Sequence, residues 1–372
     1  MGPIGAKAYF NHAGLGRPSP SLLTLMRTAK EEYRDFLFSE AGVERYMGAL
    51  VDSRKAVARV LGIGSLAGIS LMNNATTAIQ LVLTALGAML KPGNSIITSD
   101  QEHPCVVHPL NMLARRGARI VEIAAGSEEQ FLSRFEDALR LQRPSFVILS
   151  QVSYKNGRIL PVSKIGGILA QTAIPYIVDG SQAFGHIPTD VTATRAWVYI
   201  FSGHKWLGGP WGTGGLWNSE RFAALNSITL SSWEEEADPA SGGRYEGGTM
   251  SYASFIGLDT ACQEYEARQQ DRFATLAAYR AEIVERLDRR YRLADSSWDG
   301  PQAPGILALL MPSHLHSWSF AEHLLNTYGI AVKPFRPPET PDAIRISCSP
   351  ATTPEEIDLL IQALNAEANR RI

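Results

Sequence analysis

The sequence predicts an α/β fold built on a mostly parallel sheet, and two observations support this prediction. Between residues 69 and 202, short apolar runs alternate with longer segments that have helical spacing. Strands that are connected through helices in this way pair in parallel and are covered by helices on both faces. The chain has 372 residues, 45% of them hydrophobic, which is enough for one large core and a smaller second domain.

Composition and charge argue against several classes of function. The net charge is -2, and Lys and Arg form no dense block, so the chain lacks the basic surface that nucleic acids require. No apolar run reaches the roughly 18 residues that span a bilayer, and residues 1–7 lack the apolar core of a signal peptide. We therefore expect a cytoplasmic protein with neither a nucleic-acid nor a membrane partner.

The cysteines and histidines predict neither a disulfide nor a metal site. Cys105, Cys262 and Cys348 are odd in number and widely spaced, so we expect free thiols. His103 and His108 have poor helical spacing for metal ligands, and no carboxylate completes a ligand set.

Taken in order, the chain divides into a lead-in and two domains. Residues 1–20 form an ordered lead-in, and a mostly helical region follows from about residue 21 to residue 61. This helical region opens a large domain at 21–253. A long helix from about residue 254 to residue 287 opens the smaller carboxy-terminal domain, 254–372.

Residues 69–80 run from an apolar strand, through small polar residues, into an apolar helix that ends near Leu90. The helix begins at Thr76 and Thr77, where backbone N–H groups without intrahelical partners favour an anion. Alternatively, Asn74 or Thr76 only caps the helix.

Three further strands are expected at residues 94–100, 118–123 and 145–151, with a helix at about 128–141 between the last two. Parallel α/β sheets bind ligands beyond the carboxyl ends of their strands. We therefore look for functional residues at those ends.

Two more apolar strands deliver an acid and an amine to this edge of the sheet. One ends at Asp179, and the other, at residues 196–200, is followed by Lys205, which small and apolar residues surround. Desolvation makes a lysine amine a better nucleophile. An acid that pairs with a pyridinium nitrogen and an amine that forms a Schiff base are what a pyridoxal phosphate (PLP) site requires.

The segments Asp179-Gly180-Ser181-Gln182 and Ser202-Gly203-His204-Lys205 resemble those of the class V (cysteine desulfurase-like) aminotransferases, and the resemblance covers most of the chain. Within that family the chain is most similar to the cysteine and cystine C-S lyases, with isopenicillin N epimerase-like proteins further off. The resemblance implies PLP fold type I, with a mostly parallel seven-stranded sheet and a smaller α+β carboxy-terminal domain.

The resemblance also implies PLP as the cofactor and assigns its contacts. Lys205, His103 and Asp179 are the expected catalytic residues, with the His103 ring stacked on the pyridine ring; alternatively His103 is structural. Thr249 is expected to cross a homodimer interface to the neighbour's PLP phosphate. The implied cofactor-binding residues are Ala75, Thr76, His103, Asp179, Gln182, Ser202, His204, Lys205 and Thr249.

The substrate is expected to contact the lead-in and the carboxy-terminal domain. In the resembling lyases an opening similar to the one here lines the substrate, which implies roles for Asn11, His12 and Gly14; alternatively this segment is a turn before a helix. Alternation over residues 343–348 puts Arg345 and Ser347 on one strand face. A guanidinium fork suits an α-carboxylate, and the family carries its carboxylate-binding arginine here. Alternatively Arg345 pairs with an acid.

The loop at residues 152–158 departs from the family pattern, in which an asparagine commonly stands at the position of Tyr154. Tyr154, Lys155 and Asn156 are therefore candidates for substrate-specific chemistry, with Tyr154 and Asn156 as substrate contacts; alternatively the loop is a variable surface turn. Residues 208–215 are glycine-rich but lack the order of a dinucleotide fingerprint. Residues 231–239 are expected to form a solvated loop.

The leading hypothesis is a C-S β-lyase. Desulfurases carry a mobile cysteine shortly before the substrate arginine, whereas residues 333–342 contain none and Cys348 lies in a strand. We expect cystine or an S-substituted cysteine conjugate as substrate, as in the biosynthesis of sulfur-containing natural products, with a thiol or persulfide, pyruvate and ammonia as products. The alternatives are a decarboxylating oxidative deaminase, aminotransferase or epimerase on a similar substrate, a cysteine desulfurase with a displaced thiol, and a non-enzymatic PLP-fold binding protein.

Overall fold

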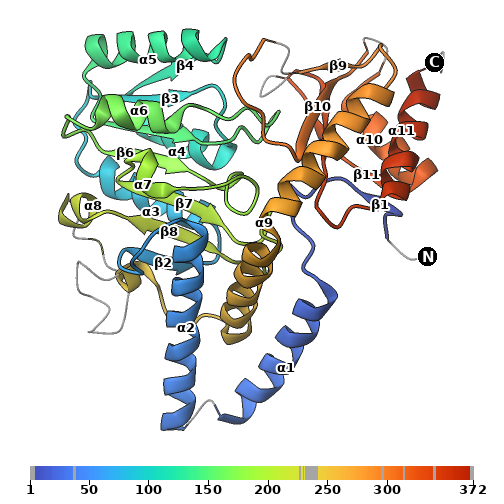
Figure 1. Cartoon of the computed structure of the whole chain (residues 1–372). Coiled ribbons are helices and arrows are strands. Elements are labelled where there is room, and N and C mark those ends of the chain that lie inside the picture. Colours follow the sequence, from blue (N-terminus) through green and yellow to red (C-terminus); the bar gives the residue numbers. More distant parts are fainter. Residues whose placement is uncertain are drawn as a thin grey trace.

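The computed structural model describes residues 5–36, 39–225, 228, 230, 242–294, 297–312, 315–337 and 341–368. The loop predicted at residues 231–239 lies outside this part of the chain. The fold is α/β, as predicted: a seven-stranded sheet forms the centre of one half and a four-stranded sheet the centre of the other (Figure 1).

The central sheet has the strand order β2-β8-β7-β6-β5-β3-β4. All neighbouring strands are parallel except β8, which runs antiparallel to β2 and β7. Six of the seven strands match predicted apolar runs, within a few residues at their ends. The strands are β2 (Ile69–Met72), β3 (Ser95–Ser99), β4 (Arg119–Ile123), β5 (Phe146–Ser150), β6 (Tyr176–Asp179), β7 (Val198–Ser202) and β8 (Gly214–Asn218).

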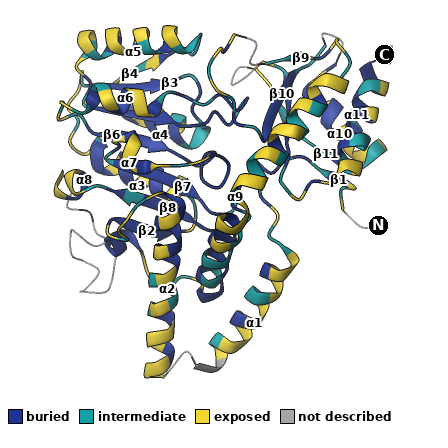
Figure 2. Ribbon diagram, viewed as in Figure 1, coloured by how far each residue is buried: buried dark blue, intermediate teal, exposed yellow. Residues whose placement is uncertain are grey.

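Helices cover both faces of this sheet because the strand side chains alternate between two apolar clusters. Ile96, Ile148 and Ile200 face the first cluster, and Leu149 and Val178 face the second. Figure 2 shows the buried strands between helices whose outer surfaces are exposed. Against the first cluster pack α3 (Ala75–Gly87), α4 (Pro104–Arg115) and α8 (Glu220–Leu225). Against the second pack α2 (Glu40–Val60), α5 (Glu128–Gln142), α6 (Val162–Leu169), α7 (Val191–Thr194) and the start of α9 (Tyr252–Arg286).

Helix α9 joins the two halves. Residues before Arg268, such as Phe255 and Leu258, belong to the core of the central sheet, whereas Leu276 and Ile283 belong to the core of the carboxy-terminal half. The backbone leaves helical geometry at Arg268, with φ -132° and ψ 15°. The kink therefore lies where the helix passes from one core to the other. The domain boundary predicted at 253/254 falls at the start of this helix.

The carboxy-terminal half is built on an antiparallel sheet of order β12-β13-β10-β9. Its elements are β9 (Arg292–Leu293), β10 (Ile306–Leu310), α10 (Ser317–His323), a π-helical turn (Leu324–Tyr328), β11 (Ile330–Ala331), β12 (Lys333–Phe335), β13 (Ala343–Ser347) and α11 (Pro354–Ala368). In the lead-in, β1 (Ala8–Tyr9) pairs in parallel with β11. The lead-in is thus attached to this half of the molecule.

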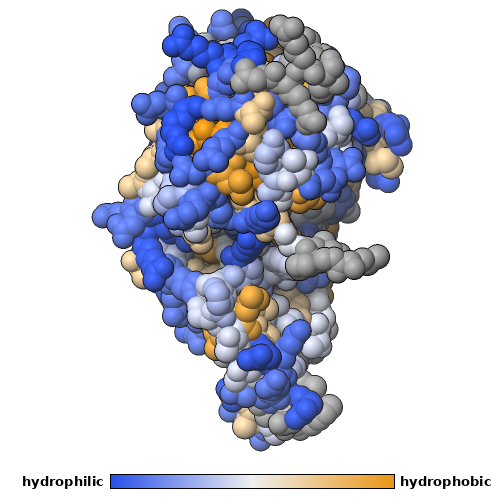
Figure 3. Space-filling view, turned by 90° about the vertical axis from the view of Figure 1, so that its right-hand side faces the viewer, coloured by the Kyte–Doolittle hydropathy of each residue, from blue (hydrophilic) through white to orange (hydrophobic). Residues whose placement is uncertain are grey.

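Helix α1 (Pro20–Phe36) and the start of α2 project from the body of the molecule (Figure 1). Seen from the carboxy-terminal side, the surface is largely hydrophilic, with hydrophobic side chains gathered in its upper half (Figure 3). A short 3-10 helix (Gly242–Tyr245) precedes α9. Within the described part of the chain, no helix combines the length and hydropathy needed to cross a membrane.

Candidate active site

A cavity of about 460 Å³ lies at the carboxyl ends of β5, β6 and β7, the edge of the sheet where ligands were expected. Strands β12 and β13 of the carboxy-terminal half close its other side. The predicted site residues that line it are Asn11, Gly14, Ala75, Thr76, His103, Tyr154, Asp179, Gln182, Ser202, His204, Lys205 and Arg345. His12, Asn156 and Thr249 do not line it.

Lys205 follows β7 in a tightly packed turn. The Gly16 N–H donates to the His204 carbonyl oxygen at 2.8 Å, and a Cβ atom at Gly16 would lie 2.0 Å from the Lys205 carbonyl oxygen. This close approach of the lead-in requires glycine. Burial lowers the pKa of Lys205, while the nearby charge of Asp179 opposes that shift. Within the described residues the amine has no hydrogen-bond partner, so it is available as a nucleophile.

Asp179, the last residue of β6, is 4% exposed. Ser181 donates to its Oδ1 atom from the backbone N–H, at 2.9 Å, and also from the hydroxyl group. The Oδ2 atom has no hydrogen-bond partner among the described residues. One carboxylate oxygen is therefore held in place while the other is left for a ligand in the cavity.

His103 caps the amino terminus of α4. Its Nδ1 atom accepts the Cys105 N–H at 3.2 Å, so the neutral ring carries its proton on Nε2. Burial, followed by the charges of Lys205 and Arg345, lowers the pKa of His103 to about 3. The ring also contacts Tyr154 edge-on, with 4.7 Å between centroids. At neutral pH, His103 is thus an uncharged ring held in one orientation at the cavity wall.

The amino terminus of α3 points its backbone donors toward the same cavity. Asn74 caps the helix by accepting the Thr77 N–H at 2.9 Å, so the capping interpretation is correct for this residue. The N–H groups of Ala75 and Thr76 have no partner among the described residues and remain for an anion. His204 lies nearby and donates from Nδ1 to the Thr213 carbonyl oxygen at 2.8 Å, which leaves its Nε2 atom unused.

Arg345 lies on the opposite wall and is 3% exposed. It donates to the Tyr154 carbonyl oxygen at 2.7 Å and to Asn11 Oδ1 at 2.9 Å, while its Nε–H has no partner. No carboxylate of the described residues pairs with it, so the alternative of an internal ion pair is not supported. Burial lowers its pKa to about 10. A buried guanidinium without a counter-ion costs several kcal/mol, and a bound anion offsets that cost.

Two predicted substrate residues lie outside this cavity. His12 is buried, packs edge-on against Tyr9 with 4.9 Å between centroids, and lines a neighbouring cavity instead. Asn156 is buried in the loop after β5, where its Oδ1 atom accepts the Arg158 N–H at 3.2 Å. Local spacing could not reveal this, because adjacent residues of a turn point in different directions.

Gln182 and Thr249 have different surroundings. The Gln182 amide bridges two segments: it donates to the Ala13 carbonyl oxygen at 2.8 Å and accepts the Trp206 indole N–H at 2.7 Å. It therefore ties the lead-in to the lysine turn. Thr249 is exposed in the segment before α9 and lies away from the cavity of its own chain.

Cys105, Lys333 and Phe335 are among the lining residues that the sequence analysis did not name as site residues. The Cys105 Sγ atom lies 3.0 Å from His103 Nδ1, and burial raises the pKa of its thiol to about 12. The signal for Cys105 was its place two residues after His103. Lys333 and Phe335 enter through the pairing of β12 with β13, which no local motif reveals. The described residues contain no cluster of three or more His, Cys, Asp or Glu side chains arranged to hold a metal.

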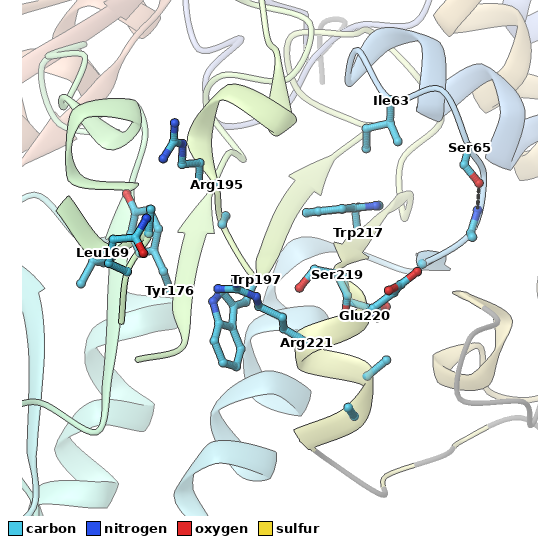
Figure 4. A pocket seen from close by; sticks show the side chains of 18 residues that line it. Ile63, Ser65, Leu169, Tyr176, Arg195, Trp197, Trp217, Ser219, Glu220 and Arg221 are labelled. Atoms are coloured by element: carbon cyan, nitrogen blue, oxygen red, sulfur yellow. Dashed lines mark hydrogen bonds between the residues drawn. The ribbon is translucent and has the colours of Figure 1, made fainter. Parts of the chain in front are cut away.

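A larger cavity, of about 940 Å³, lies at the opposite edge of the sheet (Figure 4). Tyr176, at the start of β6, and Trp197, just before β7, line it together with Arg195, Trp217 and Glu220. It contains none of the predicted site residues. The smaller cavity, at the carboxyl ends of the strands, is the one where acid, amine and guanidinium meet.

Known proteins resemble the chain over most of its length. The family model of the class-V aminotransferases matches residues 38–360. A cysteine desulfurase of Enterobacter sp. is 29% identical over 339 residues, which are 84% of this chain and 80% of that protein. A probable cysteine desulfurase of Mycolicibacterium paratuberculosis is 28% identical over 352 residues, 86% of this chain, and the chain spans about half, 49%, of that protein's length.

A solved structure shares the fold. The cystine C-S lyase C-DES, in complex with its reaction product cysteine persulfide, superposes with a TM-score of 0.83 at 23% identity and covers 97% of this chain and 98% of its own. Another structure of C-DES has glycine covalently linked to the PLP cofactor.

The cavity fits PLP in three respects. The Lys205 amine is available to hold the cofactor covalently, the Oδ2 atom of Asp179 is available for a protonated ring nitrogen, and the α3 amino terminus is available for a phosphate. The class-V aminotransferases use this cofactor. The chain therefore belongs to the class-V aminotransferase family of PLP-dependent enzymes.

Proposed function

We propose that this protein is a C-S β-lyase that acts on cystine or another S-substituted cysteine and releases a thiol or persulfide, pyruvate and ammonia. One observation carries the choice of elimination over sulfur transfer. Residues 333–342, before the substrate arginine, contain no cysteine, and Cys348 is buried in the core of the carboxy-terminal half.

Arg345 would hold the α-carboxylate of the substrate. Its Nε–H and the remaining donors of its fork suit a planar carboxylate, and its contacts with Asn11 and the Tyr154 backbone fix its direction. Because Asn11 comes from the lead-in and Tyr154 from the loop after β5, both must dock before the arginine is oriented. The substrate is thus held between the two halves of the chain.

Bound PLP supplies an electron sink that makes the α-proton acidic. Once the substrate amine has displaced it from the cofactor, the Lys205 Nζ atom would accept that proton, and its lowered pKa leaves more of the amine neutral and able to do so. The C–S bond then breaks and its electron pair leaves with the sulfur. The Nε2–H of His103 is suited to donate a hydrogen bond to that leaving sulfur, since the Nδ1 atom is occupied by the Cys105 N–H. Hydrolysis of the remaining aminoacrylate yields pyruvate and ammonia.

A panel of substrates tests this proposal. The purified enzyme is incubated with cystine, cysteine and bulky S-alkyl cysteines, with pyruvate and alanine quantified and the sulfur product identified by mass spectrometry. Equal amounts of pyruvate and sulfur product are expected. Alanine as the main product from cysteine would contradict elimination.

One observation favours cysteine desulfurase as a second candidate. Cys105 lines the cavity beside His103, and the similar proteins reported above are named cysteine desulfurases. Against this candidate, burial raises the Cys105 pKa to about 12, so the thiol is neutral and a poor nucleophile at pH 7. A desulfurase would gain the mass of one sulfur atom on Cys105 during turnover.

We also infer a homodimer in which Thr249 reaches the PLP phosphate of the neighbouring chain. Thr249 is exposed and lies outside its own cavity, which is the placement such a role requires. Thr249→Ala would then weaken PLP binding without changing the oligomeric mass, as measured by cofactor titration and light scattering. Unchanged PLP affinity would contradict the role.

A further inference from the structure

Lys333 and Arg345 are directly opposite each other in the sheet of the carboxy-terminal half. Strand β12 pairs antiparallel with β13, and the register places Lys333 against Arg345. Both side chains line the 460 Å³ cavity, so both face the same side of the ladder. Like charges that are directly opposite on one face destabilise a strand pair. Two cations at directly opposite positions that both face the active site call for a functional explanation.

The described residues that line the cavity carry an excess of positive charge. Lys333 and Arg345 on β12 and β13 are cationic, Lys205 is reserved for the cofactor, and Asp179 at the end of β6 is the acid among the lining residues. The charge of Lys333 acts across the cavity on His103. It is one of the causes that lower the pKa of His103, smaller than burial and than the charges of Lys205 and Arg345. A cavity with this charge distribution attracts substrates that carry more than one anionic group.

The other charged groups already have assignments. In the proposed function, Asp179 pairs with the ring nitrogen of PLP and the α3 amino terminus binds the PLP phosphate. Buried Arg345 binds the α-carboxylate of the substrate. Lys333 is less deeply buried than Arg345 because β12 is an edge strand of its sheet. Its ammonium group lies 5.7 Å from the ring centroid of Trp318, which is 53% exposed. Lys333 is thus placed nearer the solvent, where the part of a substrate beyond the sulfur would extend.

Aromatic side chains stand beside this lysine. Phe335 lies on the same face of β12, and its ring contacts Tyr154 edge-on with 5.6 Å between centroids. The two rings can pack against the apolar part of a sulfur substituent. From Arg345 outward, the cavity offers first the two aromatic rings and then Lys333. A sulfur substituent with an apolar linker that ends in an anion matches this order.

We propose that Lys333 binds an anionic group on the sulfur substituent, so that the preferred substrates are S-substituted cysteines whose substituent ends in a carboxylate. This assignment rests on the proposed lyase function. Cystine meets the requirement, because its second half carries a carboxylate. Lys333 is then a specificity residue.

Two isosteric substrates isolate the charge: S-(2-carboxyethyl)-cysteine and S-(2-carbamoylethyl)-cysteine. We expect the native enzyme to prefer the carboxylate about tenfold in kcat/KM, which corresponds to about 1.4 kcal/mol. Lys333→Met is expected to abolish this preference by lowering kcat/KM for the carboxylate alone, and Lys333→Arg is expected to keep it. Lys164→Met, at an exposed position in α6, is the matched control and should behave as native.

The outcomes separate the assignment from its alternatives. Equal losses for both substrates in Lys333→Met would mean that Lys333 acts on the α-carboxylate or on the fold, and the proposal falls. It also falls if the native enzyme does not discriminate the two substrates, a measurement that needs no variant. If neither substrate yields pyruvate, the lyase function fails separately. Calorimetric affinities of the two compounds for the PLP-loaded native and Lys333→Met proteins then decide the assignment, because only the proposed contact predicts a charge preference that Met removes.

Discussion

Asp179 and Lys205 stand at the carboxyl ends of two neighbouring parallel strands. Asp179 ends β6 and pairs in register with Ile200 of β7, the strand that Lys205 follows. The two charges are close enough for Asp179 to oppose the effect of burial on the lysine pKa. This arrangement places a cofactor's nitrogen and its covalent anchor on one rigid sheet edge, and the following predictions depend on it.

Lys205→Ala is expected to abolish both covalent attachment of PLP and turnover, because the other lysine that lines the cavity, Lys333, lies on the opposite wall in β12 and away from the end of β7. Borohydride reduction of the native enzyme, followed by peptide mapping, should find the pyridoxyl group on Lys205. A pyridoxyl group found on a different lysine would contradict the assignment of Lys205 as the covalent anchor. As a control, the same reduction of Lys164→Ala should leave the label where it was.

Asp179→Ala is expected to lose at least about a hundredfold in kcat even when PLP saturates the protein, because an unprotonated ring is a weaker electron sink. The comparison is made at PLP concentrations where bound cofactor, measured after release with alkali, equals one per chain. Ser181→Ala is the control variant. It removes one hydrogen-bond donor to Asp179 Oδ1 but keeps the carboxylate, so a smaller loss of kcat is expected. Ordinary turnover by the Asp179 variant at full occupancy would contradict the electronic role.

Replacing the cysteines tests elimination against sulfur transfer. Cys262 and Cys348 are buried in apolar cores, whereas Cys105 lines the cavity, so Cys105→Ser is the decisive variant. It is expected to keep pyruvate formation within roughly tenfold of native, about 1.4 kcal/mol in barrier. The readouts are pyruvate and alanine from cystine and cysteine, with intact mass of the enzyme. Alanine formation that disappears in Cys105→Ser, with a one-sulfur mass increment on the native enzyme, would establish the desulfurase instead.

His186 is expected to make the fold sensitive to acid. It is fully buried, stacks on Trp206 with 3.6 Å between ring centroids, and accepts the Gly305 N–H on Nε2 at 2.8 Å. Burial lowers its pKa from 6.5 to about 3. The folded protein therefore resists protonation that the unfolded chain accepts. The stability from this neutral ring is complete above pH 6.5 and is lost as the pH falls toward 3.

One such histidine lowers the free energy of unfolding by roughly 2 kcal/mol as the pH falls from 6.5 to 5. In urea titrations, His186→Gln is expected to have a lower free energy of unfolding than the native protein at pH 7.5. Between pH 6.5 and 5, its free energy of unfolding should fall by roughly 2 kcal/mol less than that of the native protein. The exposed histidine variant His316→Gln should follow the native curve. A native slope in His186→Gln would mean that other groups, such as His103 and His12, carry the acid sensitivity.

Much of the fold was predictable because its signals are local. The apolar runs at β2 to β7 and the helices between them follow from periods that a short window of sequence contains. Strand β8 was missed, since its glycines show no strand pattern; Gly215 is needed because a Cβ atom there would lie 2.0 Å from the Ser70 carbonyl oxygen of β2. That requirement comes from a neighbouring strand and not from the segment itself.

By itself, the sequence determined that Asp179 ends one strand, that Lys205 follows the next strand of the chain and that a helix begins near Thr76, because strand ends and helix caps depend on nearby residues. Only the tertiary structure decided which other side chains join them. The β12–β13 register brings Lys333 opposite Arg345, and the docked lead-in gives Arg345 its contact with Asn11 while it carries His12 elsewhere. Asn11 and Arg345 are 334 positions apart, and Lys333 meets Arg345 only through strand pairing, so the geometry of both contacts follows from packing that no local pattern encodes.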